Sequence, residues 1–423
     1  MLIEFSVGNY KSFKEIVTFS MVAAQITAKD KTLDVNNIFP VDDELCLLKS
    51  AAVYGPNASG KSNFVAAIRF MRWFVLNSSK ETQVMDAIEV EEFKLSTETI
   101  GTPTFFQMVF MLDGKRFRYG FEVDGERVVS EWLFHVPTIR EAKLFVREED
   151  RVDLSGQFKE GKGIPDKTRN NALFLSVVAQ FNGAIAQQIL RWFKDLTVIS
   201  GLDDKEYLAY TRRRFESKPQ QEEILRFVKK LDLGIDDIQI EKNRLSTPSL
   251  PLDMPVEFRN FLLRRSENDL SGVKTVHRIY DSEGRQASIE LFDMEQHESE
   301  GTKKLFALAA FLLNALNSGH VLVVDELDAR LHLLITCAII DLFHSNDANP
   351  HHAQLIFTTH DTHLLSNKVF RRDQIWFVEK DLLGASQLHS LVEYKVRNDA
   401  SFEKDYIHGR YGAIPFIGDL VKR

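Results

Sequence analysis

The 423-residue sequence has few of the features that mark secreted, disulfide-stabilised or membrane-spanning proteins. It contains two cysteines, Cys46 and Cys337, in or beside apolar stretches, so we expect buried thiols, no disulfide and a reducing cytoplasm. The longest apolar stretch, residues 305–324, is interrupted by polar residues and a glycine, which excludes a membrane span and indicates a helix, a turn and a strand. The N-terminus alternates like a strand and lacks a signal-peptide pattern.

The chain is also short of positive charge, because 53 basic residues against 61 acidic residues give a formal net charge of −8. Whole-chain electrostatics therefore favour repulsion from nucleic-acid phosphates. Local basic clusters occur at Arg212-Arg213-Arg214 and at Arg264-Arg265, where a solvated helix face and a DNA contact are the two interpretations. The sequence shows no internal repeat, low-complexity tract or sustained heptad run, which argues against a long coiled coil.

The most informative segment that is present follows the phosphate-binding pattern G-x-x-x-x-G-K-[ST]. Its glycines let successive backbone N–H groups point inward as an anion nest, and the next helix adds its positive N-terminal end. We expect Lys61 to reach the β- and γ-phosphates of a nucleotide and the Ser62 hydroxyl to ligate Mg²⁺. An apolar strand at residues 51–54 and a helix from Ser62 onward supply the context that this motif requires. The predicted nucleotide-binding residues here are Gly55, Pro56, Asn57, Ala58, Ser59, Gly60, Lys61, Ser62 and Asn63.

An acidic motif follows much later in the chain. Residues 321–324 indicate a buried parallel strand that brings Asp325 to the carboxyl edge of a sheet, where it can hold Mg²⁺ directly or through water. Glu326 can orient the water that attacks the γ-phosphate, or accept a proton from it. The alternative interpretation is a strand that ends in a solvated acidic turn.

Two further segments flank this strand. Ser299-Glu300-Gly301-Thr302 precedes a long apolar helix predicted at residues 303–316, and serine and glycine at a helix start can donate to an anion. Beyond the acidic strand we predict a helix from Asp328 to Phe343.

A strand predicted at residues 354–359 then ends in His360, which can contact the γ-phosphate or the attacking water. The alternative for His360-Asp361-Thr362-His363 is a metal cluster. A GTP-specific site is excluded, because Asn367-Lys368 is followed by Val369-Phe370 and does not complete the base-recognition element N-K-x-D.

The remaining patterns indicate one α/β head with an insertion. The turns Asp113-Gly114 and Asp124-Gly125 predict an antiparallel β-meander, and the pattern from residue 184 to residue 263 is helical and charged. Residues 243–255 are polar and proline-rich and are predicted as a connection, followed by a strand pair at 273–280 and 286–292. We predict three parts: an N-terminal part of the head, 1–180, a helical insertion lobe, 181–270, and a C-terminal part of the head, 271–423.

The order of these motifs is similar to that of an ABC-type ATPase head. The chain resembles the ABC-type AAA ATPases related to SMC, Rad-type break-repair and OLD proteins, and more narrowly the stand-alone abortive-infection and restriction-linked ATPases of the RloA/AbiL kind. The narrower resemblance rests on residues 3–13, 170–176 and 409–415. It implies a P-loop NTPase fold with a mostly parallel core sheet, an antiparallel side sheet and a compact helical insertion. The signature Ser-Glu-Gly-Thr, in place of Leu-Ser-Gly-Gly-Gln, argues against a transporter subunit.

The resemblance also implies a sandwich mechanism with ATP and Mg²⁺ in a homodimer or a higher even-numbered homo-oligomer. Ser299 and Gly301 of one protomer would close over the γ-phosphate held by Lys61 of the other. In the same scheme Glu326 activates water, His360 senses the γ-phosphate and Asp328 couples the two sites. For the glutamine that reports on Mg²⁺ we predict Gln180, with Gln107 as the second candidate and a surface glutamine as the alternative for either.

We therefore expect a cytoplasmic ATP hydrolase, the sensor and motor of an anti-phage or restriction-linked system. A nucleotide-gated switch with little turnover and a DNA-maintenance ATPase of the SMC, Rad or RecF type remain the alternatives. The tail after His360 is too short for a TOPRIM domain and no His-Asn-His arrangement is visible, so a nuclease or TOPRIM-like effector is expected on a separate partner protein.

Overall fold

The computed structural model describes residues 1–81, 83, 86–137, 140–202, 205–231, 234–242, 271–397 and 400–415. The chain divides into two compact units. The first comprises Met1–Ser200, Ala315–Asp328 and Thr336–Arg423, and the second comprises Gly201–Asn314 and Ala329–Ile335. The sequence predictions for Arg264-Arg265 and for a connection at residues 243–255 lie outside the described residues.

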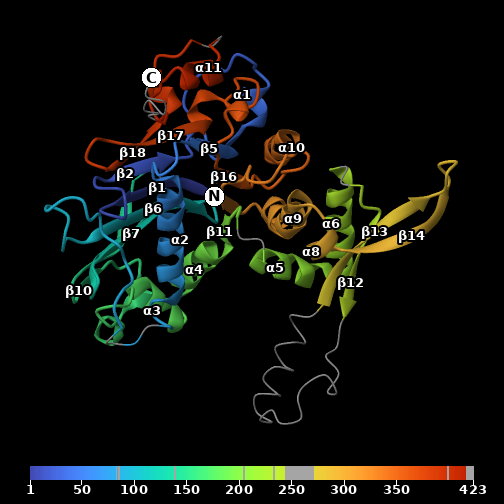
Figure 1. Ribbon diagram of the computed structural model, residues 1–423. Helices are drawn as coiled ribbons and strands as arrows, with labels where there is room; N and C mark the ends of the chain where they lie inside the picture. The colour runs from blue at the N-terminus through green and yellow to red at the C-terminus, as the bar shows by residue number, and fades with distance from the viewer. Residues whose placement is uncertain are drawn as a thin grey trace. The chain divides into compact units, whose positions relative to one another are not determined.

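The core sheet of the first unit has the strand order β11-β15-β16-β5-β17-β18 (Figure 1). Its neighbouring strands are parallel except for the last pair, β17 and β18, which is antiparallel. Every residue of β5 and β16 is buried, as expected for parallel strands that are covered on both faces. The bounds are β11 Thr197–Ser200, β15 Val321–Asp325, β16 Gln354–Thr358, β5 Ser50–Tyr54, β17 Ile375–Lys380 and β18 Ser386–Ser390.

The side sheet of the same unit is antiparallel throughout, in the order β10-β9-β8-β7-β6-β1-β2. Asp113 and Gly114 both have positive φ, 49° and 72°, as a tight two-residue hairpin requires, so the predicted turn is confirmed. The bounds are β1 Leu2–Gly8, β2 Val17–Ser20, β6 Thr104–Leu112, β7 Lys115–Val123, β8 Val128–Val136, β9 Ala142–Glu148 and β10 Arg151–Leu154.

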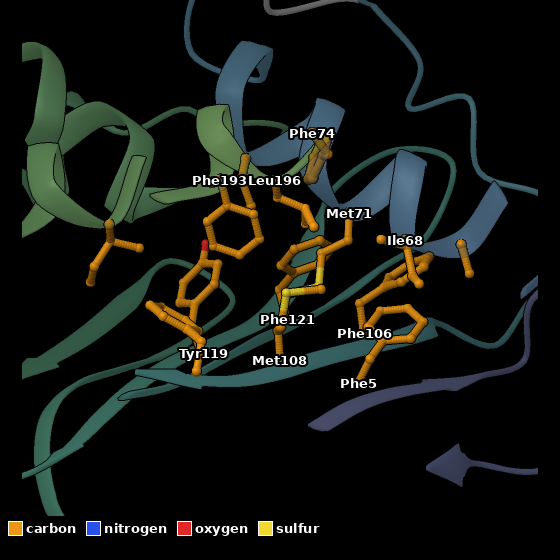
Figure 2. Packing of buried hydrophobic residues seen from close by; sticks show 14 of the residues in the cluster. Phe5, Ile68, Met71, Phe74, Phe106, Met108, Tyr119, Phe121, Phe193 and Leu196 are labelled. Carbon is orange, nitrogen blue, oxygen red and sulfur yellow. The ribbon is translucent and has the colours of Figure 1, made fainter. Parts of the chain in front are cut away.

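Helix α2 (Lys61–Asn77) is buried against both sheets. Figure 2 shows Ile68, Met71 and Phe74 of this helix facing Phe106 and other apolar side chains of the side sheet. Residues of the core sheet belong to the same apolar cluster, among them Val53, Val323 and Ile356. Because the hydrophobic stabilisation of each such buried side chain is about 1.5–3 kcal/mol, the cluster fixes the position of α2 and of the loop before it.

Helices α3 (Phe174–Gln180) and α4 (Ala184–Asp195) extend this cluster, with Phe193 and the neighbouring Leu196 packed near Tyr119 of β7 (Figure 2). The shorter elements of the first unit are α1 Leu33–Asn36, β3 Ile38–Pro40, β4 Cys46–Leu48 and α11 Phe402–Ile407.

A buried carboxylate fixes the start of α3. Glu131 of β8 accepts the backbone N–H groups of Phe174 and Leu175, at 2.6 and 3.0 Å, and the Tyr119 hydroxyl at 2.9 Å. Arg147, also buried, lies 3.8 Å from the carboxylate and partly offsets the rise that burial causes in the pKa of Glu131. The donors of the first helical turn are thus satisfied by a residue of the side sheet.

The second unit contains helices and a three-stranded sheet, β12-β13-β14. The predicted strand pair is confirmed as β13 and β14. This unit differs from the predicted insertion of residues 181–270, because α4 and β11 belong to the first unit and the insertion is not purely helical. The bounds are α5 Lys205–Phe215, α6 Lys218–Lys230, β12 Asp237–Lys242, β13 Ser271–Tyr280, β14 Gln286–Asp293, α8 Met294–His297 and α9 Glu300–Ser318.

Two sequence predictions are wrong in detail. Helix α10 is Leu333–His344 and does not begin at Asp328, because Arg330 has a positive φ of 62°, which a helix does not accommodate. Cys46 and Cys337 are free but half-buried, not buried. Among the described residues, no helix is both long and apolar enough to cross a membrane.

We predict that Glu131→Ala lowers the free energy of unfolding of the first unit by about 3–5 kcal/mol, because it leaves the buried Arg147 guanidinium without its carboxylate partner and the backbone donors of α3 without their acceptor. Urea denaturation followed by circular dichroism measures the change. Glu148→Ala, an exposed carboxylate on the neighbouring strand β9, is the control. Equal midpoints for the two variants would contradict the prediction.

Candidate functional site

The phosphate-binding loop lies between β5 and α2, at the carboxyl edge of the core sheet. Gly60 has a φ of 117°, and a Cβ there would lie 2.3 Å from the Ser386 hydroxyl oxygen. A Cβ at Gly55 would lie 2.2 Å from the carbonyl oxygen of Val378. Both glycines are therefore required by close packing, and Gly60 also by its backbone conformation.

Two serines from other parts of the chain, Ser12 and Ser386, stabilise the phosphate-binding loop, and neither contact was predicted from the sequence. The Ser386 hydroxyl donates to the Ser59 carbonyl at 2.6 Å, and the Ser386 N–H donates to the Ser12 carbonyl at 2.6 Å. Asn63, in the first turn of α2, donates to the Ser12 hydroxyl at 2.8 Å. The sequence gives no local signal for Ser386, because it lies more than three hundred residues after the loop.

Lys61 is buried at the start of α2, with 5% of its surface exposed. Its ammonium donates to the carbonyls of Gly55 and Pro56, at 2.8 and 3.0 Å. Burial lowers the pKa of Lys61 to about 8, although the carboxylates of Asp325 and Glu326 act in the opposite direction. A bound phosphate group would supply the negative charge that this buried ammonium lacks.

One threonine hydroxyl links the two acids of the acidic motif. Thr358, the last residue of β16, donates to the Asp325 carboxylate at 2.6 Å and accepts the N–H of Glu326 at 2.7 Å. This contact follows from the parallel pairing of β15 and β16. Glu326, with its positive φ, turns the chain sharply at the end of β15. The sequence predicts Asp325 at the end of the strand and Glu326 directly after it, as observed, but does not indicate Thr358 as their partner.

Asp328 and His360 meet beyond the ends of the same two strands. One oxygen of the Asp328 carboxylate accepts the backbone N–H of His360 at 3.4 Å. The other oxygen of this carboxylate is buried with no hydrogen-bond partner among the described residues. Burial and the positive charge of Lys61 lower the pKa of His360, so the imidazole is neutral near pH 7. In this form it can donate one hydrogen bond to a phosphate oxygen without adding charge.

The residues present fit a nucleotide phosphate and Mg²⁺. The loop offers backbone donors and a buried lysine, and the Ser59 hydroxyl is buried without a partner among the described residues. Mg²⁺ usually takes one or two protein oxygens, with phosphate and water oxygens completing the shell. Ser62, exposed in the first turn of α2, and Asp325 are oxygen donors of that kind.

A metal cluster at residues 360–363 is not supported. No group of three or more His, Cys, Asp or Glu side chains in the described chain is arranged to hold an ion. His363 instead pairs with Glu403 at 3.0 Å.

The structure also corrects the prediction of the Mg²⁺-sensing glutamine. Gln180 is exposed at the end of α3 and donates to the Ser79 carbonyl, just past the C-terminal end of α2. Ser62 lies at the other end of this 17-residue helix, about 25 Å away at 1.5 Å per residue. Gln107 does not replace it, because its side-chain oxygen already accepts hydrogen bonds from Arg118 and Trp132.

The signature segment lies in the second unit, at the start of α9. The Ser299 hydroxyl accepts the Thr302 N–H at 3.1 Å and so caps the helix. A Cβ at Gly301 would lie 2.8 Å from the Arg330 carbonyl oxygen, so this position needs glycine. Arg214, of the basic cluster 212–214, bonds to Tyr210 and Asn314 of the same unit.

A cavity of about 660 Å³ opens over the phosphate-binding loop, a size typical of small-molecule sites. It is lined by loop residues 55–59, His360 and Thr362, and by Glu379, Lys380, Tyr406, Ile414 and Pro415. A larger cavity of about 730 Å³ lies where His320 and Val321 begin β15, at the opposite edge of the core sheet. It contains none of the residues predicted to bind the nucleotide or to act in catalysis, so we assign the site to the smaller cavity.

Comparison with known proteins identifies the family of the chain. Residues 50–366 match the model of the family described as "AAA domain, putative AbiEii toxin, Type IV TA system". Among solved structures, the SMC head domain from Thermotoga maritima is similar, with 14% sequence identity, a TM-score of 0.39, and coverage of 92% of this chain and 98% of that chain. No curated protein matches the chain.

We predict that ATP affinity falls roughly tenfold between about pH 8 and about pH 9.5, because binding needs the Lys61 ammonium and its pKa in the free protein is about 8. The direction of the change follows from the number of protons bound in each state. Above pH 8 Lys61 of the free protein has lost a proton that it retains in the ATP complex, so binding must take up this proton and becomes weaker as the pH rises. Fluorescence titration of a labelled ATP measures the affinity. Lys61→Arg, which stays charged, should remove this dependence, and its persistence would rule out Lys61 as the titrating group.

We also predict that Ser386→Ala weakens ATP binding about fivefold, because the loop loses a hydrogen bond that pre-organises it and such a bond contributes about 1 kcal/mol. Ser390→Ala is the matched control, since Ser390 lies on the same strand and its hydroxyl bonds to Ile375, outside the loop. If both variants bind ATP equally well, the contact does not support the loop.

Proposed function

The chain belongs to the AAA domain family, and we propose that it is an Mg²⁺-dependent ATPase that works as a nucleotide-sandwich dimer. The observation that best supports this proposal is that the predicted motifs lie together at the carboxyl edge of the core sheet. The parallel strands β15, β16 and β5 end side by side, and their ends present Asp325 with Glu326, then His360, then the loop that leads to Lys61.

The residues at this edge have separate roles in phosphate binding, in Mg²⁺ binding and in the activation of water. The loop N–H groups and the Lys61 ammonium bind the phosphates, while Ser62 and Asp325 provide oxygens for Mg²⁺. Bound Mg²⁺ would neutralise charge on the phosphate oxygens. The Glu326 carboxylate accepts a proton from the attacking water, and neutral His360 donates a hydrogen bond to the γ-phosphate.

The dimer part of the proposal rests on two features of single protomers. Asp328 keeps one oxygen without a hydrogen-bond partner among the described residues, and this oxygen, buried within one protomer, would become available to a partner protomer if the site rearranges on dimerisation. Ser299 and Gly301 form a capped helix start, a geometry that binds anions such as the γ-phosphate of another protomer. Each site would then need two copies of the chain.

We further propose that ATP turnover serves as the sensor and motor of an anti-phage or restriction-linked system, with a nuclease or TOPRIM-like effector on a separate protein. The resemblance to stand-alone abortive-infection ATPases supports this, and so does the description of the matching family. A nucleotide-gated switch with little turnover is the second candidate, and DNA contact by a chain of net charge −8 is a weaker one.

We predict that Glu326→Gln lowers the ATP hydrolysis rate at least about 10²-fold and leaves ATP affinity unchanged, because only the proton acceptor is removed. Phosphate release measures the rate, and light scattering with ATP and Mg²⁺ should show a long-lived dimer. This ATP-bound form is also the one with which to capture an effector protein.

Glu126→Gln, an exposed acid in a hairpin of the side sheet, is the control and should hydrolyse ATP normally. Normal hydrolysis by Glu326→Gln would show that another group is the base. Slow hydrolysis by the unaltered protein, together with nucleotide-dependent dimerisation, would favour the switch.

A further inference from the structure

The C-terminal segment Gly409–Pro415 borders the cavity over the phosphate-binding loop. Ile414 and Pro415 line this cavity together with Tyr406 of α11 and Glu379 of β17. The segment therefore contributes to the candidate site although it follows the P-loop by some 350 residues of sequence. None of the predicted roles in phosphate binding or catalysis uses it.

The segment is held in a defined conformation. Glu379 accepts the Ala413 N–H at 2.7 Å, and the Tyr406 hydroxyl donates to the Ala413 carbonyl at 2.7 Å. Gly412 has a φ of 66°, and a Cβ there would lie 2.4 Å from the Glu379 carboxylate. The position of Ile414, two residues later, thus follows from specific contacts with β17 and α11.

The strand order gives the direction in which a nucleotide lies across this edge. The acids that serve the γ-phosphate end β15, and His360 follows β16, both on one side of the loop. Strand β17, which ends in Glu379-Lys380, lies on the other side of β5. A triphosphate oriented with its γ-phosphate toward β15 and β16 directs its nucleoside toward β17 and the C-terminal segment.

The chemistry of this side suits a nucleoside better than it suits phosphate. Tyr406, Ile414 and Pro415 offer apolar surface, and the adjacent charges of Glu379 and Lys380 offset each other, so this side has no net positive charge to hold a phosphate group. An aromatic base gains affinity by covering apolar surface of this kind. Ile414 is half-buried and Pro415 is exposed, so both retain surface that a ligand can cover.

We propose that Gly409–Pro415 forms the nucleoside-binding wall of the site, with Ile414 and Pro415 packed against the adenosine of ATP. This rests on the proposed ATPase function and adds to it the residues that bind the base and ribose. Affinity for ATP then depends on two segments that are far apart in the chain, the P-loop and this wall.

The test compares two probes, ATP and inorganic tripolyphosphate, which lacks the nucleoside, each with Mg²⁺. Thermal shift titration measures both, since it detects millimolar as well as micromolar binding. We expect Ile414→Ser to weaken ATP binding about tenfold and to leave tripolyphosphate binding unchanged. Pro415→Ala, at an exposed position that folding does not require, should weaken ATP binding several-fold with the same selectivity.

Arg410→Ala is the matched control from the same segment, because the Arg410 side chain is 70% exposed and pairs with Asp405 away from the cavity. It should bind both probes normally. Unchanged ATP affinity in Ile414→Ser and Pro415→Ala, or an equal loss for both probes, would overturn the proposal. Lys61→Ala tests the nucleotide site itself: if it still binds ATP, the proposed function fails, whatever the wall variants show.

Discussion

The parallel pairing of β11, β15, β16, β5 and β17 is the constraint on which the candidate site depends. Because the carboxyl ends of parallel strands meet at one edge, motifs that are far apart in the sequence become neighbours there. The pairing register brings Thr358 beside the end of β15, where its hydroxyl holds both Asp325 and Glu326. A shift of one residue in this register would place the side chains of Thr358 and Asp325 on opposite faces of the sheet and break their hydrogen bond.

The second requirement is a fixed P-loop, and α2 supplies it by packing between two sheets. The helix is held along its length by apolar contacts and near its far end by α3, whose start is capped by buried Glu131. At the near end, Ser12 and Ser386 bond to the loop and to Asn63. The backbone donors of the loop are therefore oriented before any anion binds, which lowers the entropic cost of binding.

Local patterns in the sequence predicted the P-loop, the acidic strand, the β-meander and the β13–β14 pair, because each depends on residues that are close together in the chain. The roles predicted for Lys61, Glu326 and His360 remain predictions that agree with the geometry. The sequence did not indicate the contacts of Thr358 and Ser386, and it gave Ile414 no role although residues 409–415 belong to the family resemblance, because these contacts arise from tertiary pairing over long separations. The prediction that Gln180 senses Mg²⁺ was wrong for the same reason. The apolar residues that precede Gln180 in the sequence do not indicate which end of α2 its side chain contacts.

The position of β5 between β16 and β17 has a consequence for folding. Both partners of this strand are synthesised more than 300 residues after it, so the P-loop strand emerges from the ribosome long before its edges can be paired. The antiparallel side sheet, built from nearer neighbours, can form meanwhile and bury one face of α2. The nascent chain thus has an interval in which the unpaired backbone edges of β5 are open to aggregation, and chaperone binding would protect it during this interval.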